Sequence, residues 1–281
     1  MRNNIVEMNH VSIRFGDTQA LKDLSFSIEE GETFGFLGPS GAGKTTTIKL
    51  LTKQLRADSG SMMLMGKNLN QIQDELFFQI GVLTDNSGIY EKLSVYENLK
   101  IFADLKRIQS HQIEEVLRKT GLWEARKKKA KDLSRGMKQR LLFSRAILYQ
   151  PKILFLDEPT SALDPATAEE IYQIIHELKR EGTTIFLTTH NMNEADRLCD
   201  RVAFLHKGHI VECGNPNDLK LKHASNRVIL LSDTGKEYET TKDKEHVVRV
   251  LKEMEGNIVC IHSIEPDLKT IFLDMTGREL K

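Results

Sequence analysis

Cysteine and long apolar runs are scarce in this chain of 281 residues. The cysteines are Cys199, Cys213 and Cys260, and no two of them form a C-x-x-C pair, which argues against a disulfide framework and against a zinc site. The N-terminal segment has no apolar stretch typical of a secretory signal, and no window approaches the ~20 apolar residues of a membrane helix. We therefore expect a protein of the reducing cytoplasm. If a membrane is involved, we expect another chain to span it.

An excess of charge is also absent. Lys plus Arg and Asp plus Glu number 40 each, so no overall field attracts nucleic acid or anionic lipid. A site for a charged ligand must then be local, and no nucleic-acid partner is expected. Apolar residues make up 40% of the chain and charged residues 28%, which is typical of a globular protein.

Hydrophobic periodicity indicates how the chain is organised. The first forty residues alternate in the manner of strands, which predicts a small β-rich element. "TFGFL" (33–37) precedes a glycine-rich loop and a helical pattern, which opens an α/β unit. Helical patterns with the capping box Ser94-x-x-Glu97 replace strand signals between about 85 and 150, and they predict a helical insertion. From residue 152 strands and helices alternate again.

The C-terminal part of the sequence is harder to interpret. A strand near 227–231 and a helix near 244–254 are predicted there. We place a domain boundary at the change of pattern, which gives a large domain over 1–222 and a small accessory domain over 223–281.

A phosphate-binding motif stands between the strand at 33–37 and the helix that follows. "GPSGAGKT" fits G-x-x-x-x-G-K-[ST] at every fixed position and has the strand and helix context that this motif requires. Its glycines let the backbone wrap a triphosphate, Lys44 supplies charge, and the Thr45 hydroxyl can bind Mg²⁺. The candidate nucleotide-binding residues of this segment are Gly38, Pro39, Ser40, Gly41, Ala42, Gly43, Lys44, Thr45 and Thr46.

A pair of carboxylates ends another buried strand. In "ILFLDEP" (153–159), four apolar residues precede Asp157 and Glu158, at the strand end where ligands of an open α/β sheet gather. Asp157 can hold Mg²⁺ through water, and Glu158 is then the candidate general base for the water that attacks the γ-phosphate. Taken alone, the pair could also be two solvated carboxylates at a strand end.

With "LSRGMKQRL" (133–141) added, the sequence resembles the ATP-binding-cassette (ABC) family over about residues 4–222. The resemblance implies an α/β phosphate-loop ATPase fold. This fold has an N-terminal antiparallel β subdomain, a mixed or parallel core sheet, a helical subdomain insertion and here a small α+β C-terminal extension. It also implies that Ser134 and Gly136 contact the γ-phosphate of ATP held by a second cassette, as a hydroxyl and an amide at a helix N-terminus can. Ser134 could equally be a plain helix cap.

The resemblance assigns roles to three further residues. Phe15 matches the aromatic that stacks on adenine, although a single Phe is more often part of a core. Asp164 belongs to the loop that senses the partner subunit, and it is also a good helix N-cap before Pro165. His190 matches the histidine that contacts the γ-phosphate and is, with Glu158, a candidate catalytic residue, although a single His at a strand end is usually a surface residue.

Three positions depart from the family pattern, and Met137 is one of them: it stands where a Gln is common in the family signature, which is the segment "LSRGMKQRL" here. Asp85 stands where a Gln usually reaches Mg²⁺ and the attacking water; a carboxylate accepts from metal-bound water but donates no amide hydrogen bond. We retain Asp85 as a candidate metal ligand. Arg135 stands where a second Gly is common in the signature, and it either adds a cation near the phosphate or points to solvent.

The resemblance implies an ATP-hydrolysing transporter subunit that uses ATP and Mg²⁺. The implied partners are a second cassette subunit, identical or paralogous, and a separate transmembrane permease that holds the chain at the cytoplasmic side of the cell membrane. Ile89, Tyr90 and Tyr96 are candidate permease contacts. "S-R-G-M-x-Q-R" is similar to cassettes that export antibiotic-, peptide- or lipid-like compounds. An importer ATPase, and a soluble ATPase acting on ribosomes or DNA, are the alternatives.

Overall fold

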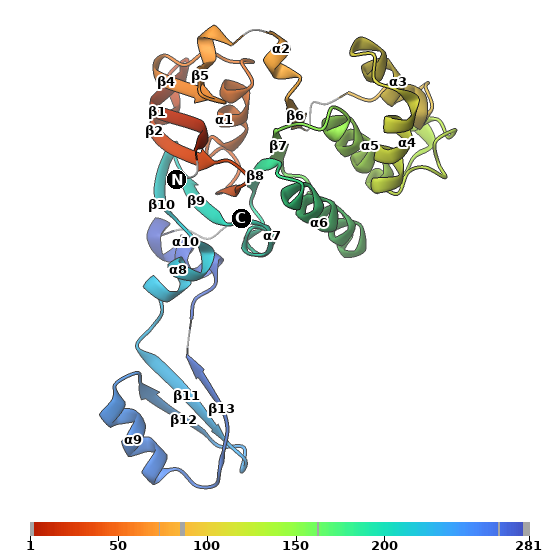
Figure 1. The fold of residues 1–281 in the computed structure, drawn as a ribbon. Coiled ribbons are helices and arrows are strands. Elements are labelled where there is room, and N and C mark those ends of the chain that lie inside the picture. The colour runs from red at the N-terminus through yellow and green to blue at the C-terminus, as the bar shows by residue number, and fades with distance from the viewer. Residues whose placement is uncertain (1–2, 73, 85–87, 162, 264, 278–281) are drawn as a thin grey trace. The chain divides into compact units, whose positions relative to one another are not determined.

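The structure, a computed structural model, describes residues 3–72, 74–84, 88–161, 163–263 and 265–277 (Figure 1). The chain forms two compact units, Met1–Cys213 and Gly214–Lys281. This division falls before α8 (Pro216–Lys222), which contacts α10 (Leu268–Thr276) within the second unit. The change of sequence pattern placed the expected boundary after residue 222, and α8, which precedes that position, lies in the second unit.

An antiparallel sheet of four strands begins the first unit, in the order β2-β1-β4-β5. Its strands are β1 (Asn4–Phe15), β2 (Thr18–Glu29), β4 (Ser59–Leu64) and β5 (Lys67–Asn68). β1 and β2 form a hairpin that turns at Gly16, where φ is +56°. The β-rich N-terminal element predicted from alternation is therefore confirmed, and Phe15 lies at the tip of its hairpin.

The second sheet has the strand order β10-β9-β3-β8-β7-β6. Its strands are β3 (Thr33–Leu37), β6 (Ile80–Leu83), β7 (Ile153–Asp157), β8 (Thr184–Thr189), β9 (Arg201–His206) and β10 (His209–Gly214). Strands β6, β7, β8, β3 and β9 pair in parallel, so their carboxyl ends meet at one edge. The glycine-rich loop, the carboxylate pair and His190 follow neighbouring strands at that edge, which brings them together.

Phenylalanines join the two sheets. Phe26 of β2 stacks on Phe34 of β3 at a centroid distance of 5.5 Å and an interplanar angle of 10°. Phe186 of β8 lies 6.0 Å from Phe26, and Phe36 and Phe155 complete the cluster. Phe34, Phe36, Phe155 and Phe186 are fully buried. These stacked, tilted and edge-to-face ring contacts add to the apolar burial that holds the core sheet in place.

Helices follow the core strands and fill the insertion. Their bounds are α1 (Lys44–Leu51), α2 (Asp74–Phe77), α3 (Val95–Leu105), α4 (Ser110–Lys119), α5 (Arg135–Ile147), α6 (Pro165–Arg180) and α7 (Met192–Leu198). Figure 1 shows α3, α4 and α5 gathered on one side of β6 and β7. Ser94 and Glu97 form the predicted capping box at the start of α3, with backbone-to-side-chain bonds of 2.7 and 3.2 Å. The helical insertion expected between about 85 and 150 is thus present.

The C-terminal unit contains an antiparallel sheet in the order β12-β11-β13. Its strands are β11 (Arg227–Ser232), β12 (Glu237–Thr241) and β13 (Ile258–Ser263), and α9 (Lys244–Glu253) contacts β12. β11 and α9 match the predicted strand and helix, and the unit is α+β as expected. Across the described parts of the chain, no helix is long and apolar enough to cross a membrane.

Candidate active site

The glycine-rich loop 38–45 is pressed against its neighbours where β3 ends. A Cβ on Gly38 would lie 2.3 Å from the Leu205 carbonyl oxygen, so the loop backbone approaches β9 more closely than any side chain permits. Gly43 has a φ of +113°, and a Cβ there would lie 2.5 Å from Leu21 Cδ2. The loop is therefore held in one conformation by backbone packing, as a phosphate cradle requires.

The predicted loop residues differ in exposure. Ser40, Gly41 and Thr45 are exposed, Pro39 and Thr46 are half-buried, and Ala42, Gly43 and Lys44 are buried. Gly43 caps α1 without a side-chain hydrogen bond to its first turn, so the cap offers no acceptor to the amides at this helix N-terminus. Unsatisfied amides and the helix dipole favour an anion at such a position.

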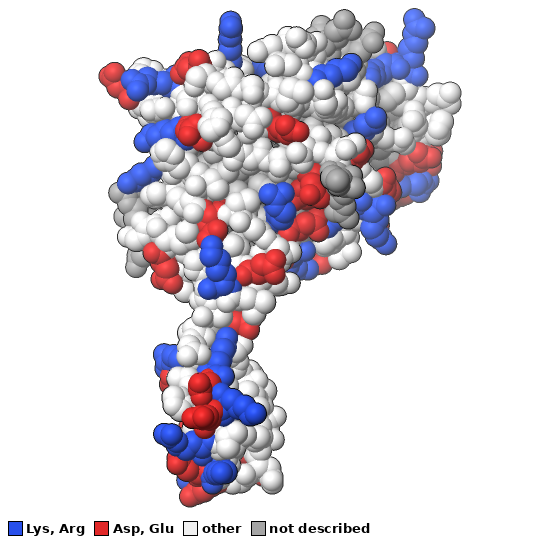
Figure 2. Space-filling view, turned by 60° about the vertical axis from the view of Figure 1, so that its left-hand side comes forward, with Lys and Arg blue, Asp and Glu red and all other residues white. Residues whose placement is uncertain are grey.

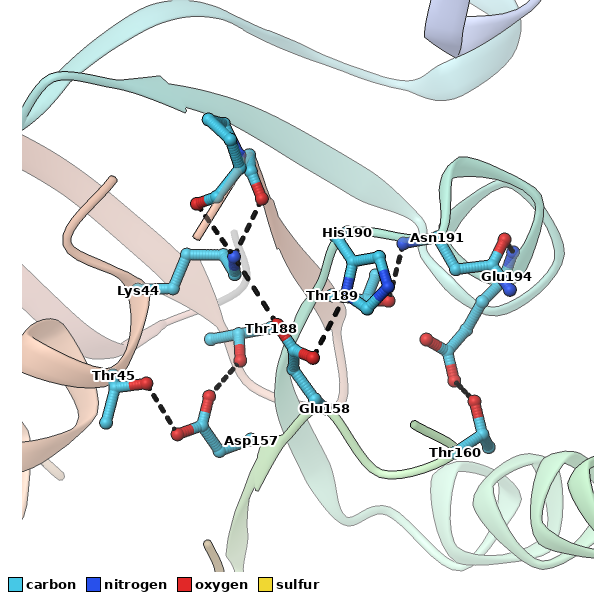
Figure 3. Close-up of polar contacts among 12 residues, drawn as sticks. Lys44, Thr45, Asp157, Glu158, Thr160, Thr188, Thr189, His190, Asn191 and Glu194 are labelled. Atoms are coloured by element: carbon cyan, nitrogen blue, oxygen red, sulfur yellow. Dashed lines mark hydrogen bonds and ion pairs between the residues drawn. The ribbon is translucent and has the colours of Figure 1, made fainter. Parts of the chain in front are cut away.

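The Lys44 ammonium lies inside the loop. Its Nζ donates to the carbonyl oxygens of Gly38 at 2.7 Å and Pro39 at 3.1 Å, and it lies 3.5 Å from Glu158 Oε1 (Figure 3). Lys44 is only 5% exposed. Burial lowers the pKa of Lys44, and the carboxylates of Glu158 and Asp157 act in the opposite direction. The ammonium is thus desolvated and aimed at the space where a phosphate would be held.

Asp157 receives hydroxyl hydrogen bonds on both carboxylate oxygens. Thr45 Oγ1 donates to Oδ2 at 2.7 Å, and Thr188 Oγ1 of β8 donates to Oδ1 (Figure 3). Asp157 is 4% exposed. The two threonines fix the plane of a buried carboxylate, and they place it directly against the hydroxyl of the phosphate loop. A hydroxyl and a carboxylate are oxygen ligands of the kind that Mg²⁺ prefers.

Glu158 occupies a strained backbone position. Its φ is +48°, in the left-handed region, which costs a residue other than Gly of order 1–3 kcal/mol. Its amide donates to the Thr188 carbonyl oxygen at 2.9 Å. The carboxylate then reaches Lys44 on one side, and on the other its Oε2 lies 3.0 Å from His190 Nδ1 (Figure 3). The structure therefore brings together both predicted catalytic residues and the phosphate-loop lysine.

Ser134 and Gly136 lie in a different place. Ser134 is the N-cap of α5, and its Oγ accepts from the Met137 amide at 3.3 Å. Gly136 faces α6, where a Cβ on it would lie 3.1 Å from Thr167 Cγ2. α5 and α1 lie apart in Figure 1, with β6 to β8 between them. Within one chain, the signature helix and the phosphate loop do not form a common site.

Phe15 and Asp164 were also predicted site residues. Phe15 is 47% exposed, so its ring is not part of the core and is free to receive a planar ligand. Asp164 is the N-cap of α6, where the Thr167 amide and hydroxyl donate to it at 3.0 and 2.7 Å. The backbone hydrogen bond from Thr167 lowers the pKa of Asp164. Asp85, the predicted metal ligand, lies outside the described residues, and so does Ala162 of the loop before Asp164.

Some polar partners at the site were not predicted from the sequence. Thr188 holds Asp157, Gln139 Nε2 of α5 donates to the Pro159 carbonyl oxygen at 2.9 Å, and Glu194 of α7 accepts from Thr160. The sequence did contain one signal for Glu194, a carboxylate in the first turn of a helix directly after His190.

This geometry defines a nucleotide-hydrolysing cassette, and comparison with known proteins identifies the family. Residues 21–161 match the family described as ABC transporter. The chain is 39% identical over 269 residues to a fluoroquinolones export ATP-binding protein of Mycobacterium tuberculosis, covering 93% of this chain and 89% of the relative. It is 35% identical to the bacitracin transport ATP-binding protein of Bacillus licheniformis, covering 83% and 76% respectively. The chain belongs to the ABC transporter family and is one of its ATP-hydrolysing, ATP-binding subunits.

Solved structures agree with this assignment. The ATP-binding subunit of an ABC transporter superposes with a TM-score of 0.70 at 27% identity, covering 78% of this chain and 92% of the other. A bacterial ABC transporter cassette described as dimeric superposes with a TM-score of 0.68 at 26% identity, covering 75% and 98%. The predicted fold class is thereby confirmed.

Proposed function

We propose that this ABC ATPase supplies the energy for a membrane exporter. Its similarity to a fluoroquinolones export ATP-binding protein extends over 93% of the chain, and its similarity to a bacitracin transport ATP-binding protein extends over 83%. The contact of Glu158 with both Lys44 and His190, beside a carboxylate fixed against Thr45, is the single observation that carries the hydrolytic part of the proposal.

ATP binds by its phosphates at the loop 38–45 in this proposal. The free N-terminus of α1 attracts the triphosphate, and Lys44 exchanges its carbonyl partners for phosphate oxygens. Phe15 stacks on the adenine at the other end of the nucleotide, since its ring is exposed at a hairpin tip.

Thr45 and Asp157 would hold Mg²⁺. Both present oxygen ligands, and Thr188 keeps the carboxylate turned toward Thr45. Over the described part of the chain, no group of three His, Cys, Asp or Glu side chains is placed to hold a metal by itself. Thr45 and Asp157 supply two oxygen ligands, so phosphate oxygens and water would complete the coordination of the ion, and such an ion neutralises phosphate charge.

Glu158 acts on the attacking water. Its carboxylate lies between Lys44 and His190, where it accepts a proton from water aligned with the γ-phosphate. His190 Nδ1 holds the carboxylate in place at 3.0 Å, and its ring is exposed enough to reach a phosphate oxygen. Base catalysis of this kind is typically worth ~10²–10⁴-fold in rate.

The second half of each ATP site comes from another cassette. Ser134 and Gly136 lie at the start of α5, apart from the phosphate loop 38–45 of their own chain. A phosphate bound at this helix N-terminus would therefore belong to ATP that is held by the loop of another subunit. The dimeric cassette among the similar structures supports this arrangement. ATP then joins two subunits, and its hydrolysis lets them separate. The second subunit is an identical copy or a paralogue.

A separate permease is the remaining partner and would hold the chain at the cytoplasmic side of the membrane. Tyr90, before α3, is 50% exposed and carries an apolar ring at the surface of the helical insertion. With the neighbouring Ile89 and Tyr96 it forms the proposed permease contact. The permease, rather than this chain, selects the cargo.

The hydrolytic proposal is tested by Glu158→Gln. The amide keeps the size of the side chain but accepts no proton, so ATP binding is expected to remain while turnover falls by ~10²-fold or more. Glu170→Gln, an exposed glutamate of α6 that contacts Arg140, is the matched control and should hydrolyse ATP normally. Rapid turnover by Glu158→Gln would refute the assignment.

The exporter proposal is tested by isolating the chain from membranes. We expect a multispanning protein to co-purify, and we expect cells that express Glu158→Gln to accumulate the cargo that wild-type cells expel. Fluoroquinolones and bacitracin are the first compounds to measure. Recovery with ribosomes or DNA instead would contradict the proposal.

A further inference from the structure

The turn that follows β7 is held by side chains from separate elements. Glu158 contacts Lys44 and His190, the Pro159 carbonyl oxygen accepts from Gln139 of α5, and the Thr160 hydroxyl donates to Glu194 of α7. Only the contacts of Glu158 belong to the proposed chemistry.

Glu194 makes the most unusual of these contacts. Its carboxyl is buried, with 2% exposure, and its Oε1 accepts from Thr160 Oγ1 at 2.6 Å (Figure 3). It lies in the first turn of α7, whose N-cap Asn191 directly follows His190. The Asn191 amide in turn donates to Thr189 Oγ1 at 2.9 Å. The Thr160–Glu194 hydrogen bond therefore adds a link between the helix that follows His190 and the turn that carries Glu158.

Burying a carboxyl group has a cost in desolvation free energy. Burial raises the pKa of Glu194, and hydrogen bonds from Thr160 and Thr189 and the charge of His190 oppose that change only in part. An apolar side chain of similar size would avoid the desolvation penalty. The strained φ of +48° at Glu158 meanwhile needs surroundings that fix the turn.

We propose that Glu194 is a positioning residue for ATP hydrolysis: its hydrogen bond with Thr160 holds the Glu158 turn and the His190 loop in one geometry. This inference rests on the proposed role of Glu158. The hydrogen bond locks Thr160, two residues after Glu158, against the helix that begins two residues after His190. When it is removed, the strained turn relaxes and the Glu158 carboxylate is no longer aimed.

The test compares Glu194→Ala, Glu194→Gln and Thr160→Val in the full chain. Misplacement of a reacting group by about 1 Å costs on the order of 10²-fold, so Glu194→Ala and Thr160→Val should each lower kcat ~10–100-fold. ATP affinity should change less than about twofold, because neither residue touches the phosphate loop. Glu194→Gln keeps a carbonyl oxygen that accepts from Thr160, and it should restore kcat to near the wild-type value.

A double-mutant cycle separates positioning from general stability. The Glu194→Ala/Thr160→Val double variant should lose less kcat than the two single losses multiplied together, because both substitutions remove the same Thr160–Glu194 hydrogen bond. Leu198→Ala, a buried position on the same helix, is the matched control: it should lower the melting temperature and leave kcat unchanged below the transition.

The possible outcomes distinguish this inference from the proposed function. An unchanged kcat in Glu194→Ala, additive losses in the double variant, a Gln variant as slow as Ala, or an equal loss in Leu198→Ala would each overturn the positioning role. Glu158→Gln is measured in the same assay. If that variant turns over rapidly, the proposed base is wrong; if it is inactive while Glu194→Ala is normal, only the positioning role fails.

Discussion

Alanine at Gly43 and alanine at Gly41 should have very different effects on stability, although both glycines lie in the phosphate loop at positive φ. Gly43 has a φ of +113°, and a Cβ there would lie 2.5 Å from Leu21 Cδ2 and 3.0 Å from the Ala20 carbonyl oxygen. Gly41 has a φ of +78° and would place its Cβ in open space. The comparison separates the cost of backbone conformation from the cost of packing.

The magnitudes follow from those contacts. Gly41→Ala bears only the conformational cost of the left-handed region, about 1–2 kcal/mol. Gly43→Ala bears a conformational cost of about 1–3 kcal/mol. Overpacking against β2 adds about another 1–3 kcal/mol. The first unit ends at Cys213, and for a domain of this size 1 kcal/mol shifts the melting temperature by roughly 2–4 °C.

Circular dichroism melts of the nucleotide-free chain measure the two losses directly. We expect the transition of the cassette to fall clearly further in Gly43→Ala than in Gly41→Ala. Equal melting temperatures, or a larger loss in Gly41→Ala, would show that the close approach of Gly43 to β2 does not constrain the loop.

Three further changes test other parts of the site. Phe15→Ala should weaken ATP binding by about 1 kcal/mol or more, because aromatic stacking on the adenine is lost, and it should hardly change the melting temperature. Titration calorimetry measures the affinity, and an unchanged affinity would show that Phe15 is not part of the site. Thr188→Val deletes the hydroxyl that donates to Asp157 Oδ1, so half-maximal ATPase activity should need more Mg²⁺. An unaltered Mg²⁺ titration would contradict the proposal that Asp157, as Thr188 orients it, holds the ion. Burial raises the pKa of Glu194 above its value of about 4.3 in the unfolded chain. Protonated Glu194 therefore contributes to the free energy of unfolding in full below that unfolded-state pKa, and this contribution is lost as the pH rises through the folded-state pKa. Glu194→Gln should therefore gain stability relative to wild type as pH rises, while the charges of His190 and Glu158 are common to both proteins; a difference that does not vary with pH would refute this.

Local patterns were enough to predict the strands and helices that carry the site. The loop 38–45 has a fixed spacing, β3 and β7 are short apolar runs, and Ser94 and Asp164 are helix caps that act within a few residues. Each of these features depends on neighbours in the sequence, so periodicity and motif rules detect them.

The contacts that orient the site could not be predicted in the same way. Thr188 bonds to Asp157 across 31 residues, and Thr160 to Glu194 across 34. Neither Thr188 nor Thr160 differs locally from an ordinary threonine in a strand or turn, and only the pairing of β7 with β8 brings them to their partners. The strand β13 and the helix α10 were likewise not assigned. In β13, "IVCIHS" has four apolar residues in succession followed by two polar ones, so the sequence shows no strand alternation.

In the proposed dimer, each ATP site combines Glu158 of one subunit with Ser134 and Gly136 of the other. Mixing two inactive variants, Glu158→Gln and Gly136→Asp, tests it most directly. A mixed dimer would contain one site with an intact base and an intact signature, so the mixture should recover up to about a quarter of wild-type ATPase activity, since about half of the dimers are mixed and each has one of two sites intact. If the mixture is as inactive as its two components, Ser134 and Gly136 do not act on the partner's nucleotide, and the two subunits do not share their ATP sites.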